Sequence, residues 1–509
     1  MTKRMKNSNS TDNHYDVAML LKEKYGFEYV CTDIGKEQWY EFKDHRWQSV
    51  QKGYTLKLKI HTEIFEDFLE ASRYYASKAM TGNCTDIEQR HWAEKAEECL
   101  KIATHKLKNE GFASQVMKTS ALLFYKRKED FIEKLDENHF LLGVENGVID
   151  LVEDDPRPNQ EHRIILREGY PDDYITKTTR VEYIPYEHFL STKDPRVKEL
   201  DIFRESIFCN EDLRDYFEGV FSSALDGYSR WEKLFILIGD GSNGKSKYMT
   251  VLENAFGDYT TKVSSSMLTG KRSLSSSATP DIMSMKGTRL VTCQEPDKTE
   301  VFNMGIVKEL TGGDTLTGRN LFETQQNFKP QALLTIACNC PPKVDNNFDF
   351  GTRRRLEYIP FETTFKDSPQ KDNERKIDPY LGIKMKNWNE VTLSYLIHRY
   401  CRMRKEGLKV PERVQQENME FERLNNSIQQ WTEEYIVEDE DGRIKQKEAY
   451  TRFKMWMKEN NSQCNIPNQK DFVDYLSKHF DKEPVKRMWE GYSLKDDEED
   501  EGGGEASIY

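Results

Sequence analysis

The sequence has no long apolar run. Its continuous apolar stretches, such as 234–238, have the length of a single strand, whereas a membrane-spanning helix needs roughly 20 apolar residues. The opening segment MTKRMKNSNSTDN is polar and has no apolar core of the kind that a secretory signal requires. We therefore expect no membrane span and no secretory leader, and we predict a disordered arm over 1–14.

Cysteines at metal-binding spacing are also missing. The nine cysteines are scattered, with no Cys-x-x-Cys motif and no Cys/His cluster, which argues against a zinc site and a disulfide framework. An odd number of cysteines without a framework is typical of a reducing compartment. We therefore expect an intracellular protein.

The chain has no excess of basic residues. It has 75 Lys and Arg against 88 Asp and Glu, a formal net charge of −13, which argues against nucleic-acid binding over the whole surface. Seven of the acidic residues lie in 496–509, which is predicted to be a disordered acidic tail. The remaining body is only mildly acidic and has room for a local basic lining, so net charge does not decide the partner.

Length and pattern predict several domains with an α/β fold. A chain of 509 residues exceeds what one core usually supports. Between the terminal arm and the tail we expect an α+β region over 15–195, a helical collar over 196–228, a nucleotide-binding domain over 229–405, a helical connector over 406–435 and a small winged-helix domain over 436–495.

The α+β region shows three local patterns. Aromatic and alternating residues between 15 and 60 predict short strands, and the composition of 84–108 predicts a helix that begins at Thr85 or Asp86. The pair Asn146-Gly147 predicts a turn between two short strands within 140–151. The acidic, proline-containing stretch 152–161 is predicted to be a loop.

The most informative motif is GDGSNGKS, at 239–246, directly after the apolar run 234–238. It matches G-x-x-x-x-G-K-[ST] and precedes a segment, 247–256, with apolar residues at helical spacing. In such a loop, backbone N–H groups at a helix N-terminus surround phosphate oxygens. Lys245 would contact the β- and γ-phosphates, and Ser246 would offer its hydroxyl to Mg²⁺. We therefore predict binding of ATP and Mg²⁺ by Gly239, Asp240, Gly241, Ser242, Asn243, Gly244, Lys245 and Ser246.

Two further strands end in polar residues that suit this chemistry. The strand 289–295 ends in Glu295, which is predicted to hold Mg²⁺ and to polarise the attacking water. Gln294 stands where many such ATPases carry a first acid, so Glu295 has to serve both purposes. The strand 332–338 ends at Asn339, which is predicted to bond the γ-phosphate or the lytic water, with an ordinary turn residue as the alternative.

Arg353, Arg354 and Arg355 then precede an apolar strand. Arginine suits a transferring phosphoryl group because its charge is permanent and its donors form a fork. Three in a row cannot all serve one site, so some are expected to neutralise acids or to touch nucleic acid. If one of them reaches the γ-phosphate of a neighbouring subunit, the protein must be an oligomer.

A hairpin is predicted over 315–329, with its tip near 322–325. A cation and an aromatic ring near such a tip suit single-stranded nucleic acid, because the charge holds phosphate and the ring stacks on a base. A plain surface hairpin is an open alternative.

Taken in order, these blocks resemble a superfamily 3 helicase, in particular the poxvirus-type and the bacteriophage or plasmid primase–helicases. The matching text is GDGSNGKS, the strand ending in Glu295, KELTGGD followed by FKP, LLTIACN and RRLEYIPF. Upstream, NGVIDL and the aromatic element ending in HRW are similar to the region that precedes the ATPase in these proteins. The segment 436–495 resembles their C-terminal winged helix.

The resemblance implies an AAA+-like P-loop ATPase core and a ring, usually a hexamer, that translocates on single-stranded DNA at a replication fork. It implies Arg354 or Arg355 as a finger acting in trans and Asn339 as the sensor. It also implies the hairpin as the DNA-gripping element, with Arg319, Phe322 and Lys329 as the candidate contacts.

The same resemblance implies a viral or prophage source, and therefore the cytoplasm of a host cell. Many relatives carry a primase domain, but the first 200 residues show no paired-carboxylate strand signature. We therefore expect a separate primase or polymerase as a partner. Two alternatives stay open, namely an origin-binding initiator or scaffold with little unwinding, which Gln294 favours, and a primase–helicase with an unrecognised primase domain.

Overall fold

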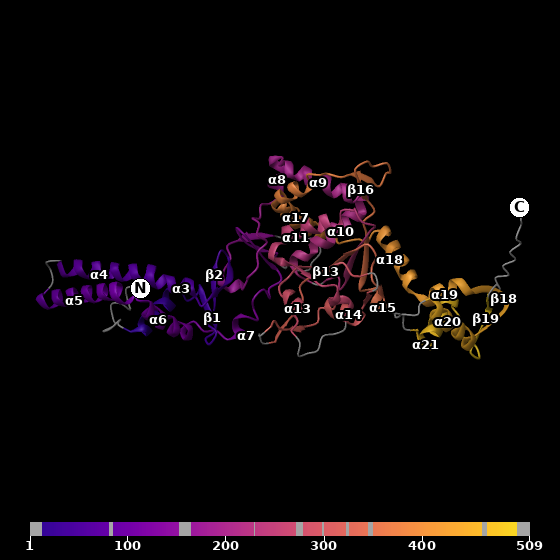
Figure 1. Cartoon of the computed structure of the whole chain (residues 1–509). Helices are drawn as coiled ribbons and strands as arrows, with labels where there is room; N and C mark the ends of the chain where they lie inside the picture. The colour runs from indigo at the N-terminus through magenta and orange to yellow at the C-terminus, as the bar shows by residue number, and fades with distance from the viewer. Residues whose placement is uncertain are drawn as a thin grey trace, which may run out of the picture.

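The computed structural model describes residues 13–80, 85–151, 164–228, 230–270, 278–297, 300–321, 325–344, 350–460 and 466–495. They form a mixed α/β structure in which helices flank a central parallel sheet, as Figure 1 shows. Among these residues, no helix combines the length and the apolar character that a membrane span requires. The predicted arm, the loop at 152–161 and the acidic tail fall almost wholly outside the described residues.

The N-terminal part combines a small antiparallel sheet with long helices. The strand order in the sheet is β1-β2-β3. A capping box starts helix α5: the Thr85 N–H donates to Glu88 Oε2 at 3.0 Å, and the Glu88 N–H donates to Thr85 Oγ1 at 3.4 Å. The predicted start of that helix is confirmed. The elements are α2 (His14–Tyr25), β1 (Tyr29–Asp33), β2 (Gln38–Lys43), β3 (Arg46–Gln51), α3 (Tyr54–Lys59), α4 (Phe65–Met80), α5 (Asp86–Lys101) and α6 (Glu110–Leu123).

Short strands are confirmed only for the middle of 15–60. The start of this stretch, up to Tyr25, belongs to helix α2 instead of a strand. The helix buries Val17, Leu21 and Tyr25 at helical spacing. Residues three to four apart lie on one face of a helix, and the buried neighbours Leu20 and Leu21 would point to opposite faces of a strand.

The next elements lead from this part to the central sheet. The predicted strand pair around Asn146-Gly147 is confirmed by the antiparallel partners Val144 and Gly147. The predicted helical stretch at 196–228 contains two helices, which Asp194 and Asn210 cap at their N-termini. The elements are α7 (Lys128–Phe131), β4 (Leu141–Val144), β5 (Gly147–Asp150), β6 (Ile165–Arg167), α8 (Tyr186–Thr192), α9 (Pro195–Ile207) and α10 (Glu211–Ser223).

The central sheet has five parallel strands in the order β15-β7-β13-β9-β8. The strands are β7 (Leu234–Ile238), β8 (Thr260–Val263), β9 (Leu290–Cys293), β13 (Leu333–Cys338) and β15 (Leu356–Pro360). The side chains of β7, β9, β13 and β15 are nearly all buried, as expected for a parallel sheet covered on both faces, whereas edge strand β8 buries only Val263.

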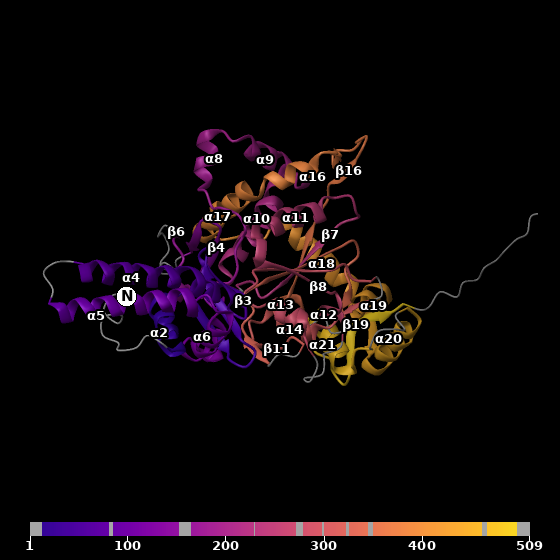
Figure 2. The ribbon, with the colours of Figure 1, turned by 60° about the vertical axis from the view of Figure 1, so that its left-hand side comes forward.

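Helices cover the two faces of this sheet. One side carries α10, α11 (Lys245–Phe256) and α17 (Asn389–Glu406), and the other carries α13 (Pro280–Ser284) and α14 (Met304–Thr311), as Figures 1 and 2 show. The remaining short elements of this part of the chain are α12 (Ser266–Thr269), β10 (Val301–Phe302), β11 (Leu316–Gly318), β12 (Gln326–Phe328), β14 (Lys343–Val344), α15 (Phe350–Arg353), β16 (Thr364–Lys366), β17 (Glu374–Lys376) and α16 (Leu381–Lys384).

The C-terminal part has its own core. Trp431, Phe453, Phe472 and Trp489 are all buried in it, and β18 and β19 pair antiparallel. The two predicted helices and the small ribbon are confirmed, and α19 shares their core through Trp431. The elements are α18 (Glu412–Asn425), α19 (Ser427–Tyr435), β18 (Ile436–Lys445), α20 (Gln446–Asn460), α21 (Gln469–Phe480) and β19 (Met488–Leu494).

A buried carboxylate joins four helices on one face of the sheet. Glu218 of α10 is 3% exposed, and Arg204 of α9 donates to its two oxygens at 2.6 and 2.8 Å. Tyr248 of α11 and Tyr395 of α17 donate to the same oxygens at 2.9 and 2.6 Å. Because its four hydrogen bonds come from three other helices, Glu218 fixes their relative positions.

We predict that Glu218→Gln destabilises the protein by about 3 kcal/mol, because the buried Arg204 guanidinium loses its carboxylate. Urea unfolding followed by circular dichroism measures the effect. The matched control is Glu406→Gln, which removes an exposed ion pair with Arg402 and should cost less than about 1 kcal/mol. Equal unfolding midpoints for the two variants would contradict the assignment.

Candidate functional site

Three strands of the central sheet end at the same level. Ile238 at the end of β7 pairs with Cys338 of β13 and with Pro360 of β15. The residues that follow, including Gly239 and Asn339, therefore lie at one edge of the sheet. In open α/β sheets this carboxyl edge is where ligands bind.

The loop 239–246, called the glycine loop below, leads from β7 into α11. Gly239, Gly241 and Gly244 have φ values of +155°, +88° and +85°, a region that favours glycine. A Cβ on Gly239 would lie 2.6 Å from the carbonyl oxygen of Phe361. The loop conformation therefore depends on the absence of side chains at these positions.

Lys245 lies at the first turn of α11 and is 6% exposed. Its Nζ donates to the carbonyl of Gly239 at 2.6 Å and to Oδ1 of Asn339 at 3.3 Å. Burial lowers the pKa of Lys245, while Glu295 and Asp240 act in the opposite direction. The ammonium is thus held over the glycine loop by neutral acceptors that an anion can replace.

Glu295 and Asn339 meet at the ends of neighbouring strands. The backbone N–H of Asn339 donates to Oε1 of Glu295 at 3.3 Å, and both residues are exposed. The structure therefore brings together three of the predicted site residues, namely Lys245, Asn339 and Glu295.

The few side-chain oxygens around the glycine loop suit a metal ion that is also coordinated by a bound ligand. No group of three or more His, Cys, Asp or Glu side chains that could hold a metal occurs among the described residues. Ser246 is exposed at the start of α11, on the same loop as Lys245, and Glu295 is the carboxylate nearby. Mg²⁺ commonly takes one or two protein oxygens and completes its coordination with phosphate oxygens and water, so this sparse set fits Mg²⁺ bound together with a nucleotide.

Asn243 has an unmet hydrogen bond inside the glycine loop. The residue is 4% exposed, its Oδ1 lies 3.5 Å from the backbone N of Lys245, and its Nδ2 has no partner among the described residues. Asn243 occupies a variable position of the motif, so the motif alone does not distinguish it from its neighbours in the loop.

The three consecutive arginines have different surroundings. Arg353 pairs with Glu422 of α18. Arg355 is 7% exposed; its guanidinium donates to the carbonyls of Glu232 and Thr311 at 3.0 and 3.2 Å and pairs with the Glu232 carboxylate. Arg354 is exposed and makes no hydrogen bond or ion pair with the described residues.

The proposal of Arg355 as a finger acting in trans needs correction. Its guanidinium is buried and bonded within its own chain, so it is not available to a second subunit. Only Arg354, of the two predicted candidates, is presented to the outside.

The hairpin predicted over 315–329 is confirmed by antiparallel pairing of Leu316 with Phe328. Arg319 follows β11 and is half-buried, and its backbone exchanges hydrogen bonds with Thr279. Lys329 is exposed just beyond β12. Phe322 lies outside the described residues.

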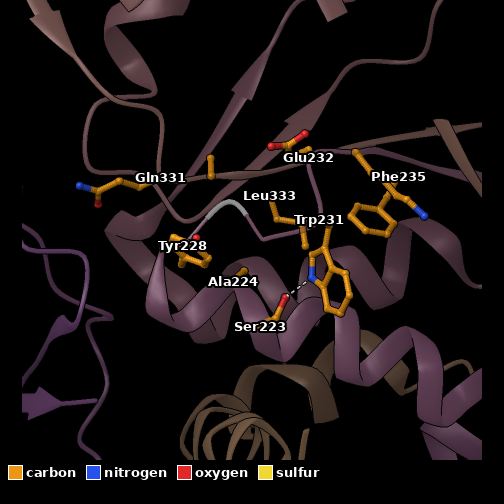
Figure 3. Close-up of a pocket in the computed structure, with 11 residues that line it drawn as sticks. Ser223, Ala224, Tyr228, Trp231, Glu232, Phe235, Gln331 and Leu333 are labelled. Atoms are coloured by element: carbon orange, nitrogen blue, oxygen red, sulfur yellow. Dashed lines mark hydrogen bonds between the residues drawn. The ribbon is translucent and has the colours of Figure 1, made fainter. Parts of the chain in front are cut away.

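A small cavity lies near the opposite, amino-terminal ends of β7 and β13, as Figure 3 shows. Its volume is about 20 Å³, which is room for little more than a water molecule. The Trp231 indole N–H donates to Ser223 Oγ at 2.8 Å, and Glu232 pairs with Arg355. Its size and its internally bonded polar groups identify this cavity as a packing void.

Two family models match the chain. One, described as D5 N terminal like, matches residues 18–214, and the other, described as Poxvirus D5 protein-like, matches residues 423–501. The central sheet lies between them.

Relatives from large DNA viruses cover most of the chain. Putative helicase L207/L206 of Acanthamoeba polyphaga mimivirus is 32% identical over 479 residues, 91% of this chain and 47% of that protein. Putative helicase 184R of Invertebrate iridescent virus 6 is 28% identical over 68% of this chain and 37% of its own length. Putative primase C962R of African swine fever virus (isolate Pig/Kenya/KEN-50/1950) is 26% identical over 78% of this chain and 42% of its own length. The chain thus spans about half the length of the curated relatives that it matches.

Among solved structures, the A form apo structure of the NrS-1 C-terminal region is similar at 12% identity and a TM-score of 0.43, covering 84% of this chain and 80% of that one. This similarity is too low to support a conclusion about the fold.

The matched regions and the relatives agree with the motifs in the sequence. Models of the D5 type match towards both ends of the chain, and viral proteins named as helicases or primases match across it. The predicted resemblance is confirmed: the chain is similar over most of its length to proteins of the poxvirus-type primase–helicase family.

Proposed function

We propose that this chain is an ATP-dependent replicative DNA helicase of superfamily 3, built on an AAA+-like P-loop ATPase core with a C-terminal winged helix. The observation that carries the proposal is the meeting of Lys245, Asn339 and Glu295 at the carboxyl edge of the parallel sheet, beside the glycine loop. The names of the viral relatives support a role in replication.

Each residue of the site has a distinct role in this proposal. The backbone N–H groups of the glycine loop and the ammonium of Lys245 bind the β- and γ-phosphates. Ser246 and Glu295 would hold Mg²⁺, which neutralises charge that develops on the phosphates. Glu295 also accepts a proton from the attacking water, and Asn339 orients that water or the γ-phosphate.

The proposed enzyme is a homo-oligomeric ring, most simply a hexamer, with ATP sites between subunits. Arg354 supports this arrangement because its exposed guanidinium has no partner among the described residues. It would stabilise the γ-phosphate bound to the neighbouring subunit. Single-stranded DNA would pass through the centre, contacted by the β11–β12 hairpin through Arg319, Phe322 and Lys329.

We predict that Lys245→Ala lowers ATP hydrolysis at least about a hundredfold, because the loop loses its cation for the phosphates. ATPase assays with and without single-stranded DNA, and strand displacement on a forked duplex, measure the effect. Lys247→Ala is the matched control, since Lys247 is exposed on the same helix. ATP hydrolysis that ignores DNA, with no strand separation by the unmodified chain, would contradict the helicase proposal.

We predict that Glu295→Gln retains ATP binding but hydrolyses ATP at least about a hundredfold more slowly, because the amide cannot accept a proton. Equilibrium binding and single-turnover hydrolysis separate the two effects. Asp297→Asn, a nearby exposed acid, should leave both unchanged. Normal DNA binding, normal assembly and full biological function of a hydrolysis-dead Glu295→Gln variant would instead support an initiator or scaffold that uses ATP only for assembly.

We predict that Arg354→Ala loses hydrolysis by about a thousandfold or more, while Arg353→Ala changes it little. Mixing the Arg354→Ala and Lys245→Ala variants should restore part of the activity, because some interfaces then combine an intact loop with an intact Arg354. Activity of the mixture no greater than the sum of its parts, or an unmodified protein that stays monomeric with ATP and DNA, would refute a shared site.

A primase–helicase is the second candidate, favoured by the relatives named as putative primases. It requires template-dependent primer synthesis from ribonucleotides by the isolated chain. If this chain makes no primers, a separate primase or polymerase partner is the expected alternative.

A further inference from the structure

Two segments from other parts of the chain pack against the glycine loop. A Cβ on Gly244 would lie 2.8 Å from Cδ1 of Ile207 and 3.4 Å from Cε2 of Phe365. The backbone N–H of Phe365 also donates to the carbonyl of Ser242 at 2.7 Å. Phe365 therefore contacts the glycine loop through both its main chain and its ring.

The same two segments are bonded to each other beside the loop. Thr363, 3% exposed, donates its hydroxyl to the carbonyl of Ile207 at 2.8 Å. Arg375 donates to Sγ of Cys209 at 2.9 Å. The end of α9 and the ribbon β16–β17 thus form one wall next to the start of α11.

One face of the β16–β17 ribbon carries a ring and a cation. Phe365 and Arg375 are paired residues of two parallel strands, and paired residues of neighbouring strands project on the same side of a sheet. The remaining bonds of the Arg375 guanidinium go to the carbonyls of Asp372 and Glu374. Among the described residues it has no carboxylate partner.

The half-buried Phe365 ring differs from the fully buried aromatic residues in the core beneath it. A nucleotide whose phosphates lie on the glycine loop still has to place a flat, apolar base and a ribose nearby. A partly exposed ring provides a stacking surface for any base, and an adjacent guanidinium attracts the anionic ligand.

We propose that Phe365 stacks on the base of the nucleotide whose phosphates the glycine loop binds, with Arg375 flanking it. The wall then distinguishes a nucleoside triphosphate from a bare triphosphate. This inference rests on the proposed function, because it takes the glycine loop as the phosphate site.

The test compares ATP with inorganic tripolyphosphate, both with Mg²⁺, by isothermal titration calorimetry on the full chain. Phe365→Ala should weaken ATP binding on the order of tenfold and leave tripolyphosphate binding unchanged. Phe365→Leu keeps an apolar side chain against Gly244 but removes the aromatic face, so it should show the same selective loss. Phe365→Trp should retain ATP affinity, and Tyr380→Ala, an exposed aromatic of the same region, serves as the control.

The outcomes separate this inference from the proposed function. Equal loss of both ligands in Phe365→Leu would mean that the ring only supports the loop, and unchanged ATP affinity would mean that it contacts no base; either result overturns the inference while the phosphate site stands. If the unmodified chain binds neither ligand, the proposed function itself fails.

Discussion

The parallel pairing of β7 with β13 on one side and β15 on the other is the constraint on which the site depends. Both neighbours come later in the chain, and both are in register with Ile238. The chain leaves β7 through the glycine loop into α11 and returns at β8, on the far edge of the sheet. The loop therefore emerges where neighbouring strands part, which is the position where α/β sheets leave room for a ligand.

The amino-terminal ends of β9 and β13 are held by the N-terminal part of the chain. Arg289, at the start of β9, is 1% exposed and donates to the carbonyl of Leu141 and to Oε1 of Gln331. Gln331, just before β13, donates in turn to the carbonyls of Asp136 and Glu137. Burial lowers the pKa of Arg289 to about 10, which leaves it charged at neutral pH.

The two ends of β9 and β13 therefore differ in their surroundings. Their amino-terminal ends are anchored by the buried Arg289 guanidinium, which donates to the neutral oxygens of Leu141 and Gln331, and leaving such a group unpaired is costly. Their carboxyl ends carry Glu295 and Asn339, which are exposed. The strands that end at the site are thus tied at their other ends to residues 136–141 of the N-terminal part.

The sequence predicted the features that depend on residues close together in the chain. The strand, the glycine loop and the helix after it were predictable because apolar spacing and glycine positions lie within one short segment. The sequence did not predict which of the three consecutive arginines is available. Two of them form ion pairs with Glu422 and Glu232, which are distant in sequence. For the same reason no local pattern marked Phe365 as a neighbour of Gly244, or Glu218 as the acceptor of Arg204, Tyr248 and Tyr395. Tertiary contacts decide which of several chemically equivalent residues is available.

Contacts within the chain support the bent backbone of the glycine loop. Its positive-φ glycines and the hydrogen bond from Phe365 to Ser242 hold the backbone, while Lys245 bonds to neutral acceptors of its own chain. A phosphate oxygen would replace a neutral acceptor with a charged one, and charge-assisted hydrogen bonds are roughly twice as strong. In the proposed function, a phosphate would exchange the acceptors of the Lys245 ammonium. This favours an anion over a neutral ligand at the loop, because only a charged acceptor gains from displacing the contacts of Lys245.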